Sequence, residues 1–350
     1  MSGQTIAVIP GDGIGAEVIA SARAVLDAAA AKYGIDLQYH EFNWSCRRYT
    51  EIGSMMPDDG LDTLGEFDAI LLGAVGWPGV ADHVSLWGLL IPIRRAFRQY
   101  VNLRPIRLFR GVSGPLRTTE DIDFVVVREN VEGEYSEIGG RLHRGFPDEM
   151  AIQESVFTRP GVTRIADYAF ELARTRRGYV TSATKSNGIV HTLPFWDEVV
   201  AERAQAYPDV RWDSEHIDAL AAKFVLQPER FDVVVGSNLF GDILSDLAAA
   251  VAGSIGIAPS ANLDPTKQYP SMFEPVHGSA PDIAGRGVAN PIGAVWSAAM
   301  MLSHLGHAAA ADDVIAAMES TLSEPGTRTG DLGGTATTEQ VTAALVAQLS

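Results

Sequence analysis

The 350-residue sequence predicts an α/β fold in which a mainly parallel sheet carries helices on both faces. Short apolar runs recur along the chain between Gly, Pro and polar residues, as buried parallel strands do. Alanine-rich stretches with helical spacing of their apolar residues alternate with these runs. Such alternation is typical of βαβ units, and the length of the chain favours about two domains.

The opening of the chain predicts a β-α unit. Residues 6–9 form an apolar run, residues 10–13 predict a turn, and residues 16–33 have helical spacing. Similar strands are expected at 37–42, 69–72, 124–127, 179–182 and 233–235. Helices are expected at 86–100, 162–174, 195–206, 242–251, 294–305 and 312–323. No repeat or flexible linker interrupts this series, so the domains are expected to be closely joined.

The charge balance restricts the class of partner. The chain has 27 basic and 44 acidic residues and a formal net charge of −17. Nucleic acids and anionic membranes select basic surfaces, so neither is an expected partner. An anionic small substrate remains compatible with this charge, because a few arginines can override it locally.

The same composition predicts a cytoplasmic protein. The chain opens without a signal-peptide pattern and has no apolar stretch of ~20 residues that would span a membrane. Its single cysteine, Cys46, excludes an intrachain disulfide and favours a reducing compartment. Arg47 and Arg48 beside Cys46 would suit a reactive thiol, but a buried structural cysteine is the favoured interpretation.

The glycine-rich opening, residues 11–16, fits the dinucleotide-binding fingerprint only loosely. Its third glycine comes one position early, and no acidic residue stands at a clean strand end about twenty positions on. A tight strand-to-helix turn is therefore the favoured interpretation, and this motif alone does not indicate a nucleotide.

Arginines gather in one part of this acidic chain, at Arg94, Arg95, Arg98 and Arg104, and Arg128 follows directly after an apolar strand. Guanidinium groups bind carboxylates through paired hydrogen bonds, so three converging arginines would suit a substrate with two carboxylates. A solvated helix face is the alternative, and both interpretations stay open. Arg128 favours a site because ligands bind at strand ends in α/β folds.

Asp242 and Asp246 are four residues apart and would share one face of a helix that begins near Gly241. Like charges at this spacing repel, and oxygen ligands suit Mg²⁺ or Mn²⁺, so a metal site is favoured over two solvated acids.

Lys185 follows the strand at 179–182 and could act as a base with a lowered pKa, although a loop lysine without a role is the commoner case.

Five segments together resemble the β-decarboxylating dehydrogenases, which form the isocitrate/isopropylmalate dehydrogenase family. They are residues 10–15, 102–105, 127–130, 238–246 and 273–285, and the resemblance covers essentially the whole chain. It implies an isopropylmalate-dehydrogenase-like fold, with two closely joined α/β domains that share a large mixed sheet, and not a true Rossmann fold. Residues 1–101 and 255–350 would form the dinucleotide-binding domain, and residues 102–254 the substrate, metal and dimerisation domain.

The resemblance also implies roles for individual residues. Three arginines would hold the substrate carboxylates: Arg94, Arg104 and Arg128. Tyr135 would be the general acid, and Lys185 would assist removal of the hydroxyl proton. Three acids would bind Mn²⁺ or Mg²⁺: Asp218, Asp242 and Asp246. The dinucleotide would lie along a segment that includes Glu274, His277, Gly278, Ser279, Ala280, Asp282 and Asn290.

A homodimer with shared active sites is implied as well, because Lys185 and Asp218 would come from the partner subunit. The carboxylate of Asp282 would accept hydrogen bonds from ribose hydroxyls and repel a 2′-phosphate, which favours NAD over NADP. Relatives in the tartrate branch often use K⁺, so K⁺ is a further implied cofactor.

Within the family, residues 82–88, 99–105 and 182–188 look like the tartrate/D-malate dehydrogenase branch. The expected reactions are therefore D-malate to pyruvate and CO₂, and tartrate to oxaloglycolate. The isopropylmalate branch places a glutamate before the first arginine, where this chain has Trp87 and no acid. The apolar segment 89–93, where tartrate relatives tend to carry a lysine, could accept an alkyl group and keeps 3-isopropylmalate as the alternative. A catalytically silent subunit is disfavoured, because every position to which the resemblance assigns a catalytic, substrate-binding or metal-binding role holds the expected residue type.

Overall fold

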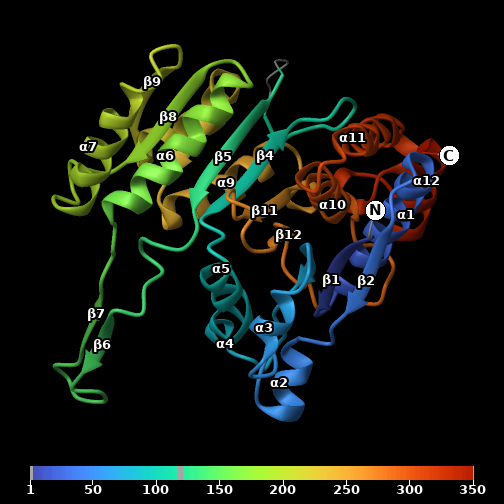
Figure 1. Cartoon of the computed structure of the whole chain (residues 1–350), viewed down its shortest axis with the longest axis horizontal. Helices are drawn as coiled ribbons and strands as arrows, with labels where there is room; N and C mark the ends of the chain where they lie inside the picture. The colour runs from blue at the N-terminus through green and yellow to red at the C-terminus, as the bar shows by residue number, and fades with distance from the viewer. Residues whose placement is uncertain (1–2, 117–120, 350) are drawn as a thin grey trace. The chain divides into compact units, whose positions relative to one another are not determined.

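The computed structural model describes residues 3–116 and 121–349. The chain forms two compact units. Unit 1 comprises Met1–Gln99, Arg107–Thr119 and Ala249–Ser350, and unit 2 comprises Tyr100–Ile106 and Glu120–Ala248. Unit 1 is thus built from both ends of the chain, and its first and last helices pack against each other (Figure 1).

The sheet of unit 1 has the strand order β2-β1-β3-β12-β11. Its strands are β1 (Gln4–Gly11), β2 (Leu37–Glu41), β3 (Ala69–Ala74), β11 (Pro259–Leu263) and β12 (Ser271–Pro275). The pairs β1–β2, β1–β3 and β3–β12 are parallel, and β11–β12 is antiparallel. The sheet is therefore mixed.

Helices cover both faces of this sheet. The unit contains α1 (Gly15–Tyr33), α2 (Cys46–Ile52), α3 (Gly60–Leu64), α4 (Asp82–Ser85), α5 (Ile91–Ala96), α10 (Ile292–His304), α11 (Ala308–Ser323) and α12 (Thr338–Leu349). Helices α1 and α10 pack on the strands, and α11 and α12 pack against them. The apolar core on the other face is contributed by the strands and by the chain from residue 44 to residue 97.

Unit 2 has the strand order β4-β5-β10-β8-β9. Its strands are β4 (Val101–Arg107), β5 (Asp123–Glu129), β8 (Tyr179–Thr184), β9 (Arg211–His216) and β10 (Val233–Gly236). The pairs β5–β10, β10–β8 and β8–β9 are parallel. Because the carboxyl ends of parallel strands meet at one edge, Arg128, Lys185 and Ser237 come from the same edge of this sheet.

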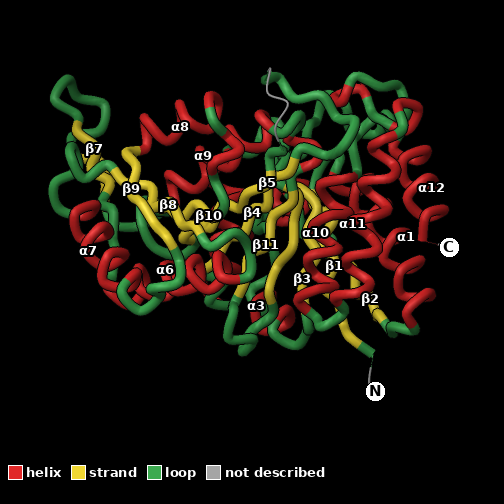
Figure 2. The backbone as a smooth tube through the Cα atoms, turned by 90° about the horizontal axis from the view of Figure 1, so that it is seen from above, coloured by secondary structure: helices red, strands yellow, loops and turns green. Residues whose placement is uncertain are grey.

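The helices of unit 2 are α6 (Arg159–Arg174), α7 (Thr192–Ala204), α8 (Ile217–Leu226) and α9 (Asn238–Val251). Figure 2 shows α8 and α9 on one face of the strands and α6 and α7 on the other. Strands β6 (Gly139–Leu142) and β7 (Met150–Gln153) pair with each other and form an arm that extends away from this layer (Figure 1).

The predicted α/β class is confirmed, and each predicted strand and helix has a counterpart. The largest local difference is at residues 86–100, which were expected to form one helix. The chain instead forms α4, a π-helical turn at Leu86–Leu90, and α5, which ends at Ala96. Helix α9 begins at Asn238, earlier than its apolar pattern predicts, because side chains from another segment satisfy its first turn.

The segment Arg107–Thr119 falls within the range expected for the second domain, but it groups with unit 1. Phe109 packs edge-on against Trp296 of α10, and Arg107 forms an ion pair with Glu319 of α11. Within the described part of the chain, no helix combines the length and the apolar character needed to cross a membrane.

Candidate active site

Arg128 stands at the carboxyl end of β5 and is almost fully buried. Its Nε and Nη2 donate to Asn238 Oδ1 at 3.0 and 2.7 Å, and Nη1 is ion-paired with Asp242 Oδ1. Helix α9 approaches so closely that a Cβ on Gly241 would lie 2.5 Å from the Arg128 Cβ. Because residue 241 is a glycine, helix α9 can lie directly against Arg128.

Arg104 of β4 approaches the same helix and is also buried. Its Nη1 donates to Ser245 Oγ at 2.5 Å and lies 3.3 Å from Asp246 Oδ1, and its Nη2 lies 3.5 Å from Asp242 Oδ1. Two of the three predicted substrate arginines thus converge on one face of α9. This excludes the solvated helix face as the interpretation of Arg104 and Arg128.

Tyr135 completes this group. Its hydroxyl donates to Asp242 Oδ2 at 2.9 Å, and the guanidinium of Arg128 lies 5.5 Å from its ring centroid. The Asp242 carboxylate can exchange a proton with this phenol, and the nearby guanidinium favours negative charge on the phenol oxygen.

Asp242 and Asp246 lie one helical turn apart, as their spacing predicts. Burial raises the pKa of Asp246, since removal from water penalises the charged carboxylate, and the charge of Asp242 adds to the effect. A bound cation would relieve this penalty, so the donor set fits a divalent metal. Across residues 3–116 and 121–349, however, no group of three or more His, Cys, Asp or Glu side chains could hold a metal ion.

The third predicted metal acid, Asp218, lies at the start of α8 and its side chain is mostly exposed. Its Oδ1 accepts a hydrogen bond from Lys185 Nζ at 2.5 Å. This cation lowers the pKa of the Asp218 carboxyl. Lys185 and Asp218 therefore form a pair of their own, apart from the carboxylates of α9.

Arg94 has a different environment from the other two arginines. It lies in α5 of unit 1, and its Nη2 donates to Glu274 Oε1 at 2.8 Å. Asn262 Nδ2 donates to the same oxygen at 2.7 Å. Glu274 was predicted to contact the dinucleotide, and in this structure its carboxylate neutralises Arg94.

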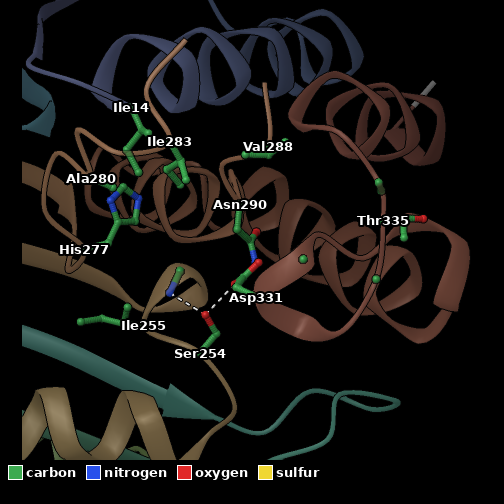
Figure 3. A pocket seen from close by; sticks show the side chains of 14 residues that line it. Ile14, Ser254, Ile255, His277, Ala280, Ile283, Val288, Asn290, Asp331 and Thr335 are labelled. Carbon is green, nitrogen blue, oxygen red and sulfur yellow. Dashed lines mark hydrogen bonds between the residues drawn. The ribbon is translucent and has the colours of Figure 1, made fainter. Parts of the chain in front are cut away.

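The structure contains a cavity of about 480 Å³ in unit 1 (Figure 3). Three predicted cofactor residues line it, namely His277, Ala280 and Asn290. The wall also includes the apolar side chains of Ile14, Ile283 and Val288 (Figure 3). Gly278, Ser279 and Asp282 are not among its lining residues, although Asp282 lies between Ala280 and Ile283 in the sequence and is exposed.

The polar floor of this cavity was not predicted. Asp331 Oδ2 accepts from Asn290 Nδ2 at 3.0 Å and from Ser254 Oγ at 2.6 Å. Asp331 stands in a Gly/Thr-rich loop without periodicity, so no sequence signal marked it.

His277 is the buried polar group that best indicates a ligand. Its Nδ1 lies 3.0 Å from the Gly278 carbonyl, and its Nε2 is buried without a hydrogen-bond partner among the residues that the structure describes. Burial lowers the pKa of His277 and favours the neutral ring. If Nδ1 carries the proton and donates it to this carbonyl, Nε2 is an acceptor for a ligand N–H.

The glycine-rich opening forms the predicted tight turn. Gly11 and Gly13 both have positive φ, and a Cβ on either would lie 2.0 Å from a backbone carbonyl oxygen. The carboxylate of Asp12 accepts from the backbone N–H groups of Cys46 and Gly76. Cys46 is fully buried, as the favoured interpretation of a structural cysteine expects, and burial raises the pKa of its thiol to about 12. The glycine-rich pattern did not indicate that Ile14, within this turn, lines the cavity.

Part of the apolar segment 89–93 is buried in the core. Leu89 and Ile93 are fully buried and pack in the core of unit 1 with Trp44 and Met55. Their helical spacing turns both side chains to the same interior face. Leu90 and Pro92 are only partly buried, so burial removes Leu89 and Ile93, but not the whole segment, from an alkyl-binding surface.

Comparison with known proteins agrees with this geometry. The family model described as isocitrate/isopropylmalate dehydrogenase matches residues 5–345. The chain therefore belongs to this family of dehydrogenases.

The relatives identify the branch. The chain is 57% identical to the D-malate dehydrogenase [decarboxylating] of Escherichia coli (strain K12), covering 99% of this chain and 98% of that one. It is 57% identical to the tartrate dehydrogenase/decarboxylase of Pseudomonas putida, over 97% of this chain and 96% of that one. The crystal structure of isocitrate dehydrogenase from Methylococcus capsulatus has a TM-score of 0.90, 34% identity and 99% coverage of both chains. The predicted tartrate/D-malate branch is confirmed.

Proposed function

We propose that this chain oxidises a small 2-hydroxy diacid with NAD and a divalent metal ion, with release of CO₂ when the substrate is D-malate. D-malate would give pyruvate and CO₂, and tartrate would give oxaloglycolate. The observation that carries the proposal is the convergence of Arg104, Arg128 and Tyr135 on the two carboxylates of α9.

The two buried arginines bind the substrate. Arg104 and Arg128 present planar guanidinium groups that match carboxylates in shape and charge. Without substrate, their charges are balanced by Asp242 and Asp246. A diacid adds two negative charges beside those acids, so binding of the diacid and of a cation would support each other.

Asp242 and Asp246 would hold Mn²⁺ or Mg²⁺, and Asp218 of a second copy would complete the ligand set. Two carboxylates one helical turn apart support a cation at this position. Bound there, the metal ion supplies a Lewis acid that lowers the pKa of the substrate hydroxyl and stabilises negative charge on its oxygen.

The cavity of unit 1 would receive the adenosine part of NAD. Its apolar walls can sandwich a purine, and the orphaned Nε2 of a neutral His277 can accept from the exocyclic amine. Bound there, NAD would supply the acceptor for the hydride from C2 of the substrate. Asp282, exposed beside the cavity, would accept hydrogen bonds from the ribose and repel a 2′-phosphate.

Two residues of unit 2 would handle the protons. Lys185 receives the proton of the 2-hydroxyl as the hydride leaves C2. After CO₂ departs with cleavage of the C3–carboxyl bond, Tyr135 delivers one proton to C3. One proton is lost and one is gained, so D-malate and NAD⁺ yield pyruvate, CO₂ and NADH in balance.

A homodimer with shared sites accounts for the separate Lys185–Asp218 pair. Unit 2 also exposes large apolar side chains on its arm, namely Ile138, Leu142, Phe146, Met150 and Ile152. Exposed apolar groups in one region favour contact with another protein surface. The resemblance supports a second copy of this chain as that surface.

The proposal is tested by NADH absorbance with metal-stripped enzyme to which Mn²⁺ and K⁺ are returned. D-malate, the tartrate isomers and 3-isopropylmalate are compared side by side. Metal-dependent turnover of D-malate or a tartrate well above 3-isopropylmalate is expected. Preference for 3-isopropylmalate by an order of magnitude would contradict it, and inactivity on every diacid would favour a silent subunit.

A further inference from the structure

Glu134 lies directly before Tyr135 and holds the start of α9. Its Oε1 accepts from the Ser237 hydroxyl at 2.7 Å, and its Oε2 accepts from the backbone N–H of Leu239 at 3.0 Å. Both carboxylate oxygens are thus directed to the first turn of the helix that carries Asp242 and Asp246.

The first turn of a helix has backbone N–H groups without partners inside the helix, and it carries a partial positive charge. A carboxylate from another segment satisfies both needs. Ser237 also takes part, because its Oγ lies 3.4 Å from the Phe240 N–H. The start of α9 is therefore fixed by Glu134 and Ser237 together.

The contact closes a ring of interactions. Glu134 is bonded to α9, α9 carries Asp242, and Asp242 accepts from the hydroxyl of Tyr135 at 2.9 Å. Tyr135 is covalently next to Glu134. The phenol and the carboxylate it meets are consequently held from both sides, by one loop residue and one helix.

We propose that Glu134 is the positioning residue for the proton donor: by binding the first turn of α9, its carboxylate sets where the Tyr135 hydroxyl lies relative to Asp242. This inference rests on the proposed function, in which Tyr135 delivers the proton to C3. Glu134 itself touches no reacting atom.

The neighbouring Glu132 offers a matched control. It belongs to the same loop and has the same charge, but its carboxylate binds the backbone N–H and the hydroxyl of Thr158, at 2.9 and 2.8 Å. Thr158 caps α6, which carries none of the proposed catalytic residues. Glu132→Gln therefore removes a comparable carboxylate contact at Thr158, while the backbone carbonyl of Glu132 still accepts from Asn238 Nδ2 of α9 at 3.1 Å.

The test is a double-mutant cycle on D-malate turnover. Glu134→Gln is expected to lower kcat by about tenfold to a hundredfold, since small misplacements of catalytic groups have effects of this size. Tyr135→Phe is expected to lower kcat further. Glu134→Gln should cause a smaller loss in the Tyr135→Phe background than in the wild type, because part of its effect passes through the phenol and the rest through Asp242. Glu132→Gln should lower the melting temperature but keep kcat, and its effects should add to those of Tyr135→Phe.

Hydrogen exchange provides a readout apart from turnover. Peptides that cover residues 237–243 should exchange faster in Glu134→Gln and at the wild-type rate in Glu132→Gln. Unchanged exchange, full activity of Glu134→Gln, or additive losses with Tyr135→Phe would each overturn the positioning role. If the wild-type chain turned over no diacid, the proposed function would fail and the positioning role with it. An active wild type with an additive cycle would overturn the positioning role alone.

Discussion

Arg94 and Glu274 form an ion pair with an Nη2–Oε1 distance of 2.8 Å, and both side chains are less than a tenth exposed. They are 180 residues apart in the sequence. The pair joins α5 to β12 within unit 1 and lies among buried groups, so neither charge can be left alone without a large free-energy penalty.

Glu274→Ala should lower the free energy of unfolding by roughly 3–5 kcal/mol, because it leaves the Arg94 guanidinium buried without its counter-charge. Chemical denaturation measures this change. Arg94→Met combined with Glu274→Leu should recover much of the loss, since an apolar pair can replace a buried ion pair. A single variant as stable as the wild type would show that the pair is not needed for stability.

Asp246→Asn should weaken Mn²⁺ binding by at least about tenfold, because one anionic ligand is lost. Mutation of residues that only hydrogen-bond to metal ligands already weakens metal binding by about tenfold. Titration calorimetry on the metal-stripped protein measures the affinity directly. Asp312→Asn, an exposed acid on α11, is the matched control and should bind Mn²⁺ as the wild type does. Equal affinities for the two variants would remove Asp246 from the proposed ligand set.

Shared active sites predict complementation between inactive chains. Lys185→Met and Asp242→Asn should each abolish turnover alone. In a mixed dimer, one site carries both changes and the other carries neither, so a statistical mixture should regain about a quarter of the wild-type activity. The mixture is prepared by unfolding and refolding the two variants together. An inactive mixture would place Lys185 and Asp242 in the same site of one chain.

Asp282→Ala should raise the ratio of kcat/KM for NADP to that for NAD, because a carboxylate that repels a 2′-phosphate is removed. Arg286 lies one turn further on, with Nη1 3.5 Å from the Asp282 carbonyl, and its charge would then favour the phosphate. Steady-state kinetics with both dinucleotides measure the ratio. An unchanged ratio would indicate that Asp282 does not face the ribose.

The buried carboxyl of Glu129 should make the free energy of unfolding depend on pH. Burial raises the pKa of this carboxyl to about 7, against the opposing effects of Arg164 and backbone N–H groups. In the folded state Glu129 holds its proton at pH values where the unfolded chain has released it. Stability should therefore fall as the pH rises from about 4.5 through 7, by a total on the order of 3 kcal/mol.

Denaturation of the wild type and of Glu129→Gln at pH 5.5 and 8 tests this dependence. The amide does not titrate, so the difference between the two pH values should be smaller in the variant. An equal difference in both proteins would assign the pH dependence to other groups.

The local features of this fold were predictable from the sequence. Apolar runs marked β1, β3 and β10 because these strands are buried on both faces and need continuous apolar residues. The spacing of Asp242 and Asp246 placed both on one helix face. Strand β9 was missed because five of its six residues are polar or charged, which gives it no apolar run.

The pairing of distant residues was not predictable in the same way. Arg94 is expected from the family resemblance to hold a substrate carboxylate, and nothing local indicated that Glu274 is its partner in the folded chain. Asp331 gave no signal because its role depends on Asn290 and Ser254, which only the fold brings to it. Glu134 was equally silent, since a cap supplied by a distant loop leaves no pattern in the helix that it caps.

The composition of unit 1 from both chain ends has a consequence for biosynthesis. Strand β3 ends at Ala74, and its neighbour β12 begins at Ser271. At typical rates of translation, the nascent chain waits roughly 10–40 s between these two points. During that interval β3 presents an unfinished edge to the crowded interior of the cell, where it can be captured by chaperones or by other nascent chains. Chaperones that bind the nascent chain are therefore expected to cover its first third until the last third has emerged.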